Sequence, residues 1–339
     1  MTKRISLSGI KPTGTIHLGN YLGMIRPALE LAKEYQALYF IADAHALNQV
    51  HNGDDLNRWT YEVTALWLAL GMDPEKVVFF RQSDIPEIFE LTIILAASTG
   101  KGLMNRAHAY KDAVEENLAE GRDPDAGINM GLYTYPILMA ADILLYGSHV
   151  VPVGKDQVQH VEIAADIAGA FNHMYGETFV IPEALVRPEV AIVPGLDGRK
   201  MSKSYNNVIP VFAPSKEIHK KVMSITTDSR VKEEAKDPDS DNLFNLYALF
   251  ATAEEAETMR ATYLRGGFGY GEVKQALFDV LERTFGEMRE MYEHYLEDKD
   301  KLELILRAGA TKARLIGTPI IEKARRAVGF RKVAGQRME

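Results

Sequence analysis

Two short strings of polar side chains in this sequence have the residue types that bind a triphosphate. One is His-Leu-Gly-Asn at 17–20, near the amino terminus, and the other is Lys-Met-Ser-Lys-Ser at 200–204, in mid-chain. Lysine ammonium groups are point charges suited to the β- and γ-phosphates of ATP, whereas imidazole and amide groups donate hydrogen bonds to phosphate oxygens. We therefore expect a two-part ATP site in which the second string closes over a nucleotide that rests on the first. Its candidate catalytic residues are His17, Asn20, Lys200 and Lys203.

Such a site suits a reaction in which a carboxylate attacks the α-phosphorus of ATP and pyrophosphate leaves. Negative charge moves toward the leaving oxygens, so positioning and cations carry the catalysis and no covalent protein nucleophile is needed. Mg²⁺ that bridges the phosphates is the expected metal, held mainly by ATP and not by a set of protein ligands. Taken alone, each string has a structural alternative: a surface loop for the lysines and a helix cap for the histidine.

The elements around the strings are those of a doubly wound α/β sheet. Apolar runs at 5–10, 38–42 and 77–81 predict strands, and amphipathic stretches at 21–34 and 56–70 predict the helices between them. Strands that are apolar on both faces and joined by helical crossovers indicate a parallel, Rossmann-like sheet, whose ligands lie at the carboxyl ends of the strands. The first string follows such a strand and opens a helix, where backbone N–H groups and the helix dipole favour phosphate.

Beyond residue 204 the sequence pattern becomes helical, which predicts a second, all-helical domain. Helices are expected at about 214–224, 242–250, 253–263, 272–296 and 302–315. The pair Thr318-Pro319 predicts the start of a further helix, because threonine caps a helix and proline suits its first position.

Composition excludes several kinds of chemistry and of location. The chain has no cysteine, which rules out disulfides, thiolate nucleophiles and cysteine-held zinc or iron–sulfur centres. No stretch approaches the roughly 18 apolar residues of a membrane span, and no secretory pattern opens the chain, so we expect a cytoplasmic protein with no membrane partner. The net charge is −8, yet the part from Arg307 onward has nine Lys or Arg against two Glu, giving +7. This basic end predicts either contact with a polyanion or a solvated helical face.

A third segment, residues 132–146, places a carboxylate in a strongly apolar helix. Burying such an acid is costly unless something binds it. Tyr135, Met139 and Asp142 stand at i, i+4 and i+7 and therefore share one helical face. A carboxylate at the end of a pocket lined by Met and Tyr can accept a hydrogen bond from an indole N–H or a phenol O–H, which predicts a site for a large aromatic ring. The alternative is a capping or salt-bridging acid in an ordinary core.

Five blocks of the sequence match one known family in order. They are Gly-x-x-Pro-Thr-Gly-x-x-His-x-Gly-Asn-Tyr at 9–21, Thr-Tyr-Pro-x-Leu-Met-Ala-Ala-Asp-Ile-Leu at 134–144, Val-Pro-Val-Gly-Lys-Asp-Gln at 151–157, Lys-Met-Ser-Lys-Ser at 200–204 and Thr-Asp-Ser at 227–229. The chain thus resembles the bacterial-type tryptophanyl-tRNA synthetases, of class I, over nearly its full length. The resemblance implies that ATP and L-tryptophan form an adenylate and pyrophosphate, and that the aminoacyl group passes to the 3′-terminal adenosine of tRNA(Trp). It also implies a homodimer.

The resemblance also implies roles for individual residues. Asp142 would bind the indole nitrogen with Met139 beside the ring, and Tyr135 with Gln157 would hold the ammonium and carboxylate of the amino acid. His45 would lie close to that pocket. The implied ATP-binding residues are Lys11, Thr13, Gly19, Asn20, Gly154, Asp156, Lys200, Met201, Ser202 and Lys203, with Gly154 and Asp156 near the ribose. The implied tryptophan-binding residues are Leu7, His45, Tyr135, Met139, Asp142 and Gln157.

The family resemblance also suggests how the chain is divided. We interpret residues 1–190 as a Rossmann-like catalytic domain that binds ATP and tryptophan. Residues 191–300 would be a helical domain that carries the lysine-rich loop and contacts the anticodon arm, and residues 301–339 would be basic helices that pack back on the catalytic domain.

The chain departs from the family at several positions. Lys11-Pro12-Thr13-Gly14 stands where Gln-Pro-Ser-Gly is usual, His17 where threonine is usual, and Leu7 where a phenylalanine commonly walls the indole pocket. Residues 105–111 also differ from the common Asn-Arg-Met-Thr-Gln-Phe-Lys. These departures leave the reaction type intact and are compatible with a divergent or auxiliary form of the enzyme. A tyrosyl-tRNA synthetase and a catalytically idle paralogue with a regulatory binding role stay open as competing interpretations.

Overall fold

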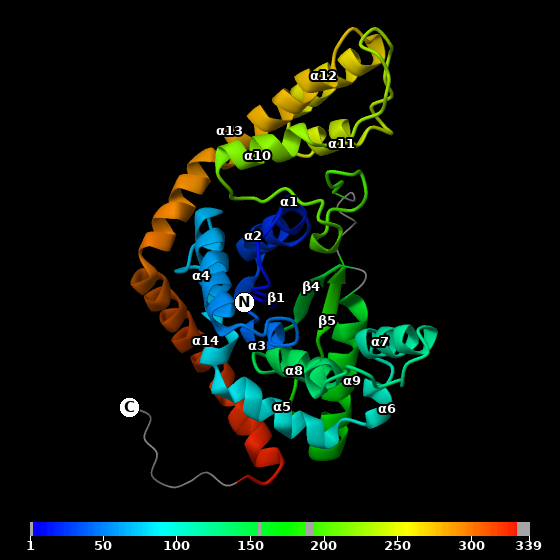
Figure 1. Ribbon diagram of the computed structural model, residues 1–339. Helices are drawn as coiled ribbons and strands as arrows, with labels where there is room; N and C mark the ends of the chain where they lie inside the picture. Colours follow the sequence, from blue (N-terminus) through cyan, green and yellow to red (C-terminus); the bar gives the residue numbers. More distant parts are fainter. Residues whose placement is uncertain (1–2, 155–156, 187–192, 331–339) are drawn as a thin grey trace.

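A parallel sheet flanked by helices forms one part of the molecule, and a helical extension forms its other end (Figure 1). The computed structural model describes residues 3–154, 157–186 and 193–330. The strands are β1 (Ile5–Ile10), β2 (Gln36–Ile41), β3 (Val78–Arg81), β4 (Val150–Val153) and β5 (Glu183–Val186). They form a five-stranded sheet in the order β3-β2-β1-β4-β5, and all pairs are parallel. The predicted doubly wound α/β fold is confirmed.

Alternate residues of the strands enter two different cores, one on each face of the sheet. In β2, Ala37 and Tyr39 belong to one buried cluster, whereas Leu38 and Phe40 belong to the other. Both faces are apolar because successive side chains of a strand point to opposite sides and helices cover both sides.

The helices connect the strands and build the extension. The helices of the sheet domain are α1 (Leu18–Asn20), α2 (Arg26–Glu34), α3 (Asp43–Ala46), α4 (Gly53–Ala69), α5 (Pro86–Ser98), α6 (Lys101–Met104), α7 (His108–Ala119), α8 (Met130–Leu144) and α9 (Val158–Tyr175). Those that follow are α10 (Ser215–Met223), α11 (Asn242–Ala248), α12 (Ala253–Arg265), α13 (Tyr270–Glu297) and α14 (Lys299–Ala327). A π-helical turn, Tyr21–Ile25, joins α1 to α2. None of the helices in the described residues is long and apolar enough to cross a membrane.

The order of the strands predicts where a ligand binds. The chain moves from β1 outward to β2 and β3, and then returns to the other side of β1 for β4 and β5. In an open parallel sheet the ligand crevice lies at the carboxyl ends of the two strands where this direction reverses. Here those strands are β1 and β4, which end at Ile10 and Val153.

The last helix runs along the sheet domain without a break. The expectation of a helix that starts at Pro319 is wrong, because α14 continues through that proline. Proline removes one backbone donor from a helix. The hydroxyl of Thr318 donates to the carbonyl oxygen of Arg314 (2.6 Å), and Ala313 and Ile321 on either side are buried in the core. Tertiary packing therefore holds one helix together where the sequence indicated two.

The basic side chains of α14 contact acidic side chains of the sheet domain. Arg314 forms an ion pair with Glu87 (2.6 Å), Arg325 with Glu90, and Lys312 with Glu75 (3.3 Å). Each of these pairs is at least partly open to solvent and contributes about 1 kcal/mol or less. The uneven charge along the sequence is thus balanced partly within the molecule, where α14 lies beside α5 (Figure 1).

Gly309 packs directly against the backbone of β3. A methyl group at this position would overlap the carbonyl oxygen of Phe79 in β3. Because a backbone atom cannot move aside as a side chain can, we expect Gly309→Ala to lower the free energy of unfolding by about 3 kcal/mol. Urea denaturation followed by circular dichroism measures this change. Gly286→Ala in α13 is the control, since its methyl group meets nothing within 4 Å, and it should leave stability unchanged or raise it.

Candidate active site

The first string consists of His17 and the three residues of α1, and it follows the loop that leaves the carboxyl end of β1. The backbone N–H of His17 donates to the side-chain oxygen of Asn20 (3.2 Å), which fixes the start of α1. The loop also pairs with a distant segment of the chain. The N–H of Leu18 donates to the carbonyl of Ile209 (2.9 Å), and His17 forms an antiparallel bridge with Pro210.

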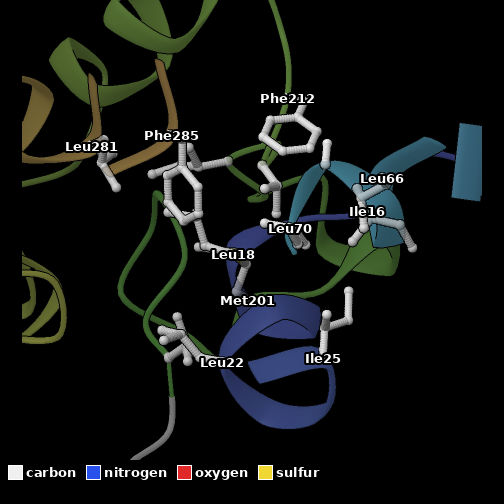
Figure 2. Packing of buried hydrophobic residues seen from close by; sticks show 14 of the residues in the cluster. Ile16, Leu18, Leu22, Ile25, Leu66, Leu70, Met201, Phe212, Leu281 and Phe285 are labelled. Carbon is white, nitrogen blue, oxygen red and sulfur yellow. The ribbon is translucent and has the colours of Figure 1, made fainter. Parts of the chain in front are cut away.

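The second string lies directly against the first. Met201 is buried in the same cluster as Leu18, Leu22 and Ile25, so its side chain anchors the lysine-rich segment to the first helices (Figure 2). Burying a methionine side chain stabilises such an arrangement by about 2 kcal/mol. A methyl group on Gly19 would come within 3.0 Å of the His17 ring and 3.5 Å of the Met201 β-carbon. A side chain at this position would therefore displace the His17 ring by a few tenths of an ångström, whereas the Met201 β-carbon would be at an ordinary contact distance.

Lys203 crosses from the second string to the loop of the first. Its ammonium donates to the carbonyl oxygen of Thr13 (3.0 Å). Burial lowers the pKa of Lys203 and also that of Lys11, which belongs to the same loop as Thr13. An anion bound between these lysines would stabilise their charged forms. The two buried ammonium groups are chemically suited to a phosphate partner.

His17 is kept neutral by its surroundings. Burial lowers its pKa to about 4, and the positive charge of Lys203 acts in the same direction. Its Nδ1 atom is buried and has no hydrogen-bond partner among the described residues. Buried polar atoms normally have a partner, so a ligand atom is a natural one here.

Asn207 gives the lysine-rich segment its shape, and the sequence did not single it out. It is 2% exposed, its side-chain oxygen accepts from the N–H of Ser202 (2.8 Å), and its amide donates to the carbonyl of Lys200 (3.1 Å). The side chain of Lys200 itself is exposed, and the hydroxyl of Ser202 contacts that of Ser204. The one signal for Asn207 in the sequence is its position three residues after the string.

Asp142 of α8 lies in a dense hydrogen-bond network with residues that follow β2 and β3. Its carboxylate, 1% exposed, accepts from the Gln82 amide at 2.8 Å (Oδ1) and 3.0 Å (Oδ2), and from Nε2 of His45 at 2.8 Å. Burial raises the pKa of Asp142, while the hydrogen bonds from His45 and Gln82 oppose this shift. These contacts with described residues occupy three of the carboxylate's roughly four acceptor directions, which leaves one on Oδ1. Gln82 directly follows β3, so the sequence already placed it at the carboxyl edge of the sheet, but its contact with Asp142 was not predicted.

Tyr135 belongs to a second hydrogen-bonded group. Its hydroxyl contacts Nε2 of His160, and Nδ1 of His160 contacts the side-chain oxygen of Gln157 (2.9 Å). Burial raises the pKa of Tyr135 to about 12. The ring centroids of Tyr135 and His45 are 6.4 Å apart, so the two groups border one region. No histidine of α9 was predicted to belong to a site, and the i, i+3 spacing of Gln157 and His160 was the available signal.

The remaining candidate residues are placed as follows. Leu7, 2% exposed, lies in β1 within a core cluster, and Met139 packs against that cluster from α8. Gly154 directly follows β4, and its carbonyl accepts from the N–H of Gln157 (3.0 Å). Asp156 lies outside the described residues.

The arrangement combines two chemical features at the carboxyl edge of the sheet. Cationic and hydrogen-bonding groups gather around the loop after β1, and a buried carboxylate with an adjacent tyrosine group lies beyond the ends of β2 and β3. The first feature suits a triphosphate. The second suits a ligand with a hydrogen-bond donor on an apolar body.

Comparison with known proteins gives close matches. A family model described as tRNA synthetases class I (W and Y) matches residues 2–286. The tryptophan-tRNA ligase of Pseudomonas aeruginosa is 53% identical over 336 residues, which cover 98% of this chain and 75% of that protein. The tryptophanyl-tRNA synthetase of Campylobacter jejuni, complexed with ADP and tryptophan, matches with a TM-score of 0.89 at 43% identity, covering 96% of this chain and 99% of that chain. The tyrosyl-tRNA synthetase of Archaeoglobus fulgidus matches in fold alone, with a TM-score of 0.62 at 19% identity, covering 86% and 90%.

Proposed function

Because the chain belongs to the class I tRNA synthetases of the W and Y family, we infer that it activates L-tryptophan with ATP and joins it to tRNA(Trp). The first step gives tryptophanyl-adenylate and pyrophosphate, and the second passes the aminoacyl group to the 3′-terminal adenosine. The observation that carries this inference is the similarity to tryptophan-tRNA ligases over nearly the whole chain. The geometry of the crevice supports the roles of individual residues proposed below.

The triphosphate of ATP is proposed to lie between the two strings. Lys203 would exchange its contact with the Thr13 carbonyl for phosphate oxygens, which attract an ammonium group more strongly than a neutral carbonyl does. As pyrophosphate leaves, charge grows on the oxygens that Lys203 faces, so its contribution is greatest in the transition state. His17, as a neutral imidazole, and Asn20 would donate hydrogen bonds from the side of α1.

Eight further residues complete the proposed nucleotide site. They are Lys11, Thr13, Gly19, Gly154, Asp156, Lys200, Met201 and Ser202. Mg²⁺ would reach this site on the triphosphate and neutralise part of its charge. The lysines that surround the loop suit phosphate oxygens and not a metal ion, and no group of three His, Asp or Glu side chains in the part of the chain that the structure describes could hold one.

The tryptophan pocket is proposed to lie next to Asp142. The indole N–H would donate to the acceptor direction left on Oδ1, with Met139 and Leu7 against the ring and His45 beside it. Tyr135 and Gln157 would hold the ammonium and carboxylate of the amino acid, and His160 orients them. The carboxylate of tryptophan then faces the loop after β1, where the α-phosphorus must be.

The tRNA contacts and the assembly are also part of the proposal. Residues 191–300 would contact the anticodon arm, residues 1–190 would bind the acceptor end, and residues 301–339 would support the catalytic domain. We propose a cytoplasmic homodimer in which one tRNA spans both subunits.

Tryptophan-dependent exchange of pyrophosphate into ATP tests this function in the purified protein. We expect exchange with tryptophan, and at least tenfold weaker exchange with tyrosine at equal concentration, because a phenol places its donor differently from an indole. Folded protein that shows no exchange with any aromatic amino acid would contradict the proposed reaction. Stronger exchange with tyrosine would contradict the proposed substrate.

A further inference from the structure

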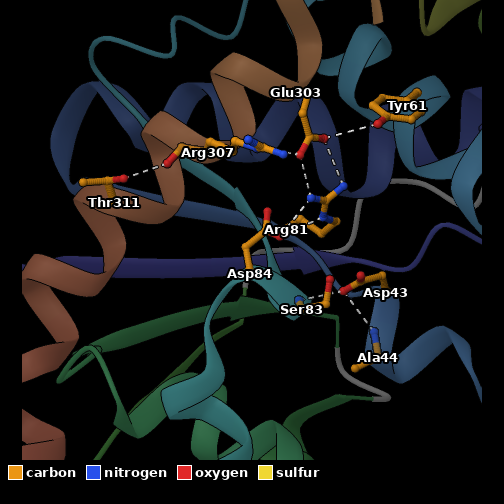
Figure 3. Close-up of polar contacts among 9 residues, drawn as sticks. All are labelled: Asp43, Ala44, Tyr61, Arg81, Ser83, Asp84, Glu303, Arg307 and Thr311. Carbon is orange, nitrogen blue, oxygen red and sulfur yellow. Dashed lines mark hydrogen bonds and ion pairs between the residues drawn. The ribbon is translucent and has the colours of Figure 1, made fainter. Parts of the chain in front are cut away.

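An ion-pair cluster joins the last helix to the end of β3. Arg81, the last residue of β3, binds Glu303 of α14 through Nη1 (3.2 Å) and Nη2 (3.0 Å), and it binds Asp84 through Nη2 (2.8 Å) (Figure 3). Glu303 also accepts from the hydroxyl of Tyr61 (3.2 Å) and from Arg307 (3.0 Å). The side chains of Arg81 and Glu303 are 17% and 20% exposed, so solvent screens this pair less than it screens the surface pairs of α14.

The residue that follows Arg81 is the main partner of Asp142. Gln82 is completely buried, and its amide donates to both carboxylate oxygens of Asp142 (2.8 and 3.0 Å). Its side-chain oxygen accepts from the N–H groups of Ala44 (3.2 Å) and His45 (3.4 Å). The Gln82 amide therefore donates to a residue of α8, and its oxygen accepts from the start of α3. A rotation of this side chain would break all of these contacts.

The turn that carries Gln82 is held on both sides. Arg81 and Asp84 bind each other across the turn, and the N–H of Ser83 donates to the carboxylate of Asp43 (3.0 Å), which also accepts from Ala44 (3.1 Å) (Figure 3). Glu303 ties this turn to α14, near the far end of the sequence. Its ion pair with Arg81 therefore holds the first end of the turn, next to Gln82, from outside the Gln82–Asp142 network.

We propose that Gln82 is a specificity-determining positioning residue and that α14 acts on the amino-acid pocket through it, along the chain Glu303, Arg81, Gln82, Asp142. Gln82 sets which acceptor direction of Asp142 is left for the ligand, and Glu303 sets where Gln82 lies. This inference rests on the proposed role of Asp142 in binding tryptophan. It adds that the ion pair between Glu303 and Arg81, outside the pocket, controls how precisely Asp142 is oriented toward the ligand.

The first test is Gln82→Glu. This change keeps the size of the side chain and the acceptor for Ala44 and His45, but it replaces the donor facing Asp142 by a second carboxylate. A hydrogen bond to a charged group contributes about 1.5 to 3 kcal/mol, so we expect KM for tryptophan to rise roughly 10- to 100-fold. The KM for ATP and kcat in pyrophosphate exchange should stay within about twofold.

A matched control exists for this change. Gln275 also donates from its amide to an aspartate, Asp279 (2.8 Å), but on the exposed side of α13. Gln275→Glu should leave both KM values unchanged. If Gln82→Glu raises the KM for ATP and lowers kcat as much as it raises the KM for tryptophan, Gln82 has a general structural role and the inference is wrong.

The second test is Glu303→Gln, which weakens the link to Arg81 without removing the side chain. We expect KM for tryptophan to rise about fivefold, a size typical of coupling through intermediate residues. Glu87→Gln is the control, since Glu87 is also a half-buried acid paired with an arginine of α14 but is attached to α5. Equal effects of both variants would mean that α14 acts merely as a scaffold, which would overturn the inference.

The double variant Gln82→Glu with Glu303→Gln decides whether one residue acts through the other. If Glu303 acts through Gln82, adding Glu303→Gln does not change the KM for tryptophan of the Gln82→Glu variant. Independent effects on this KM would multiply and would contradict the proposed chain.

The outcomes also separate this inference from the proposed function. Wild-type protein without exchange contradicts the function, whereas active wild-type protein with variants that behave like their controls contradicts the inference alone. If Gln82→Glu does not fold, the Glu303→Gln comparison still decides the role of α14.

Discussion

Lys203→Ala is expected to lower kcat for tryptophan-dependent pyrophosphate exchange by about 100-fold or more, equivalent to about 2.7 kcal/mol of transition-state stabilisation. Lys203 is the cation of the second string that reaches the loop of the first, where its ammonium is 3.0 Å from the Thr13 carbonyl oxygen. The charge on the departing pyrophosphate grows as the reaction proceeds, so the loss should fall on kcat more than on the KM for ATP. Initial rates at saturating and subsaturating ATP separate these two quantities.

The chain contains a close control for this substitution. Lys274 in α13 also donates from its ammonium to a backbone carbonyl, that of Met223 (3.0 Å), and burial lowers its pKa as well. Lys274→Ala therefore removes a lysine of the same kind at a place remote from the crevice, and exchange should continue at the wild-type rate. Unchanged turnover in Lys203→Ala would remove Lys203 from the mechanism, and equal losses in both variants would point to a general effect on the fold.

The sequence predicted the sheet well, and it marked the two strings that the structure brings into contact, because both depend on local patterns. The apolar run at 5–10 matches β1 with its observed bounds, and glycine, proline and polar residues marked the loop that follows it. Strands β4 and β5 were not predicted, because β4 contains Pro152, which disfavours a strand, and β5 begins with a glutamate and has no buried residue, so neither forms a clear apolar run. The break expected at Pro319 was also a local inference, and the packing of α14 against the sheet overrode it.

The parts of the site that the sequence did not reveal are those held by distant partners. Asp142 could be recognised because an acid in an apolar helix is conspicuous, but its partner Gln82 is 60 residues away and lies in no motif. His160 and Asn207 are polar residues of common types, and their roles depend on which groups the fold brings beside them. Residue types and spacing therefore indicated the candidate site residues, whereas the hydrogen-bond network around them could be identified only from the structure.

Asp142→Asn is expected to lower kcat/KM for tryptophan by about 100-fold and to reduce the preference for tryptophan over phenylalanine by a similar factor. Asparagine has nearly the same shape but no charge, so the indole N–H loses an ionic acceptor buried in a region where such a bond is worth about 1.5 to 3 kcal/mol. Phenylalanine has no ring N–H, so kcat/KM for phenylalanine should fall little. A site built around a hydrogen bond rejects ligands that lack it, and that rejection disappears with the bond. Exchange rates with each amino acid measure both changes.

Asp142→Ala separates recognition of the ring from support of the fold. It leaves the buried donors of Gln82 and His45 without a partner, which should lower the free energy of unfolding by about 1 to 3 kcal/mol for each donor. Asp241→Asn, at an aspartate that accepts from Phe244 and Tyr263 in the helical extension, controls for the loss of a carboxylate elsewhere and should keep full discrimination. If Asp142→Asn and Asp142→Ala still prefer tryptophan over phenylalanine as strongly as the wild type, another residue binds the ring nitrogen. Asp142 would then serve to fix His45 and Gln82, because its existing contacts already suffice for that structural task.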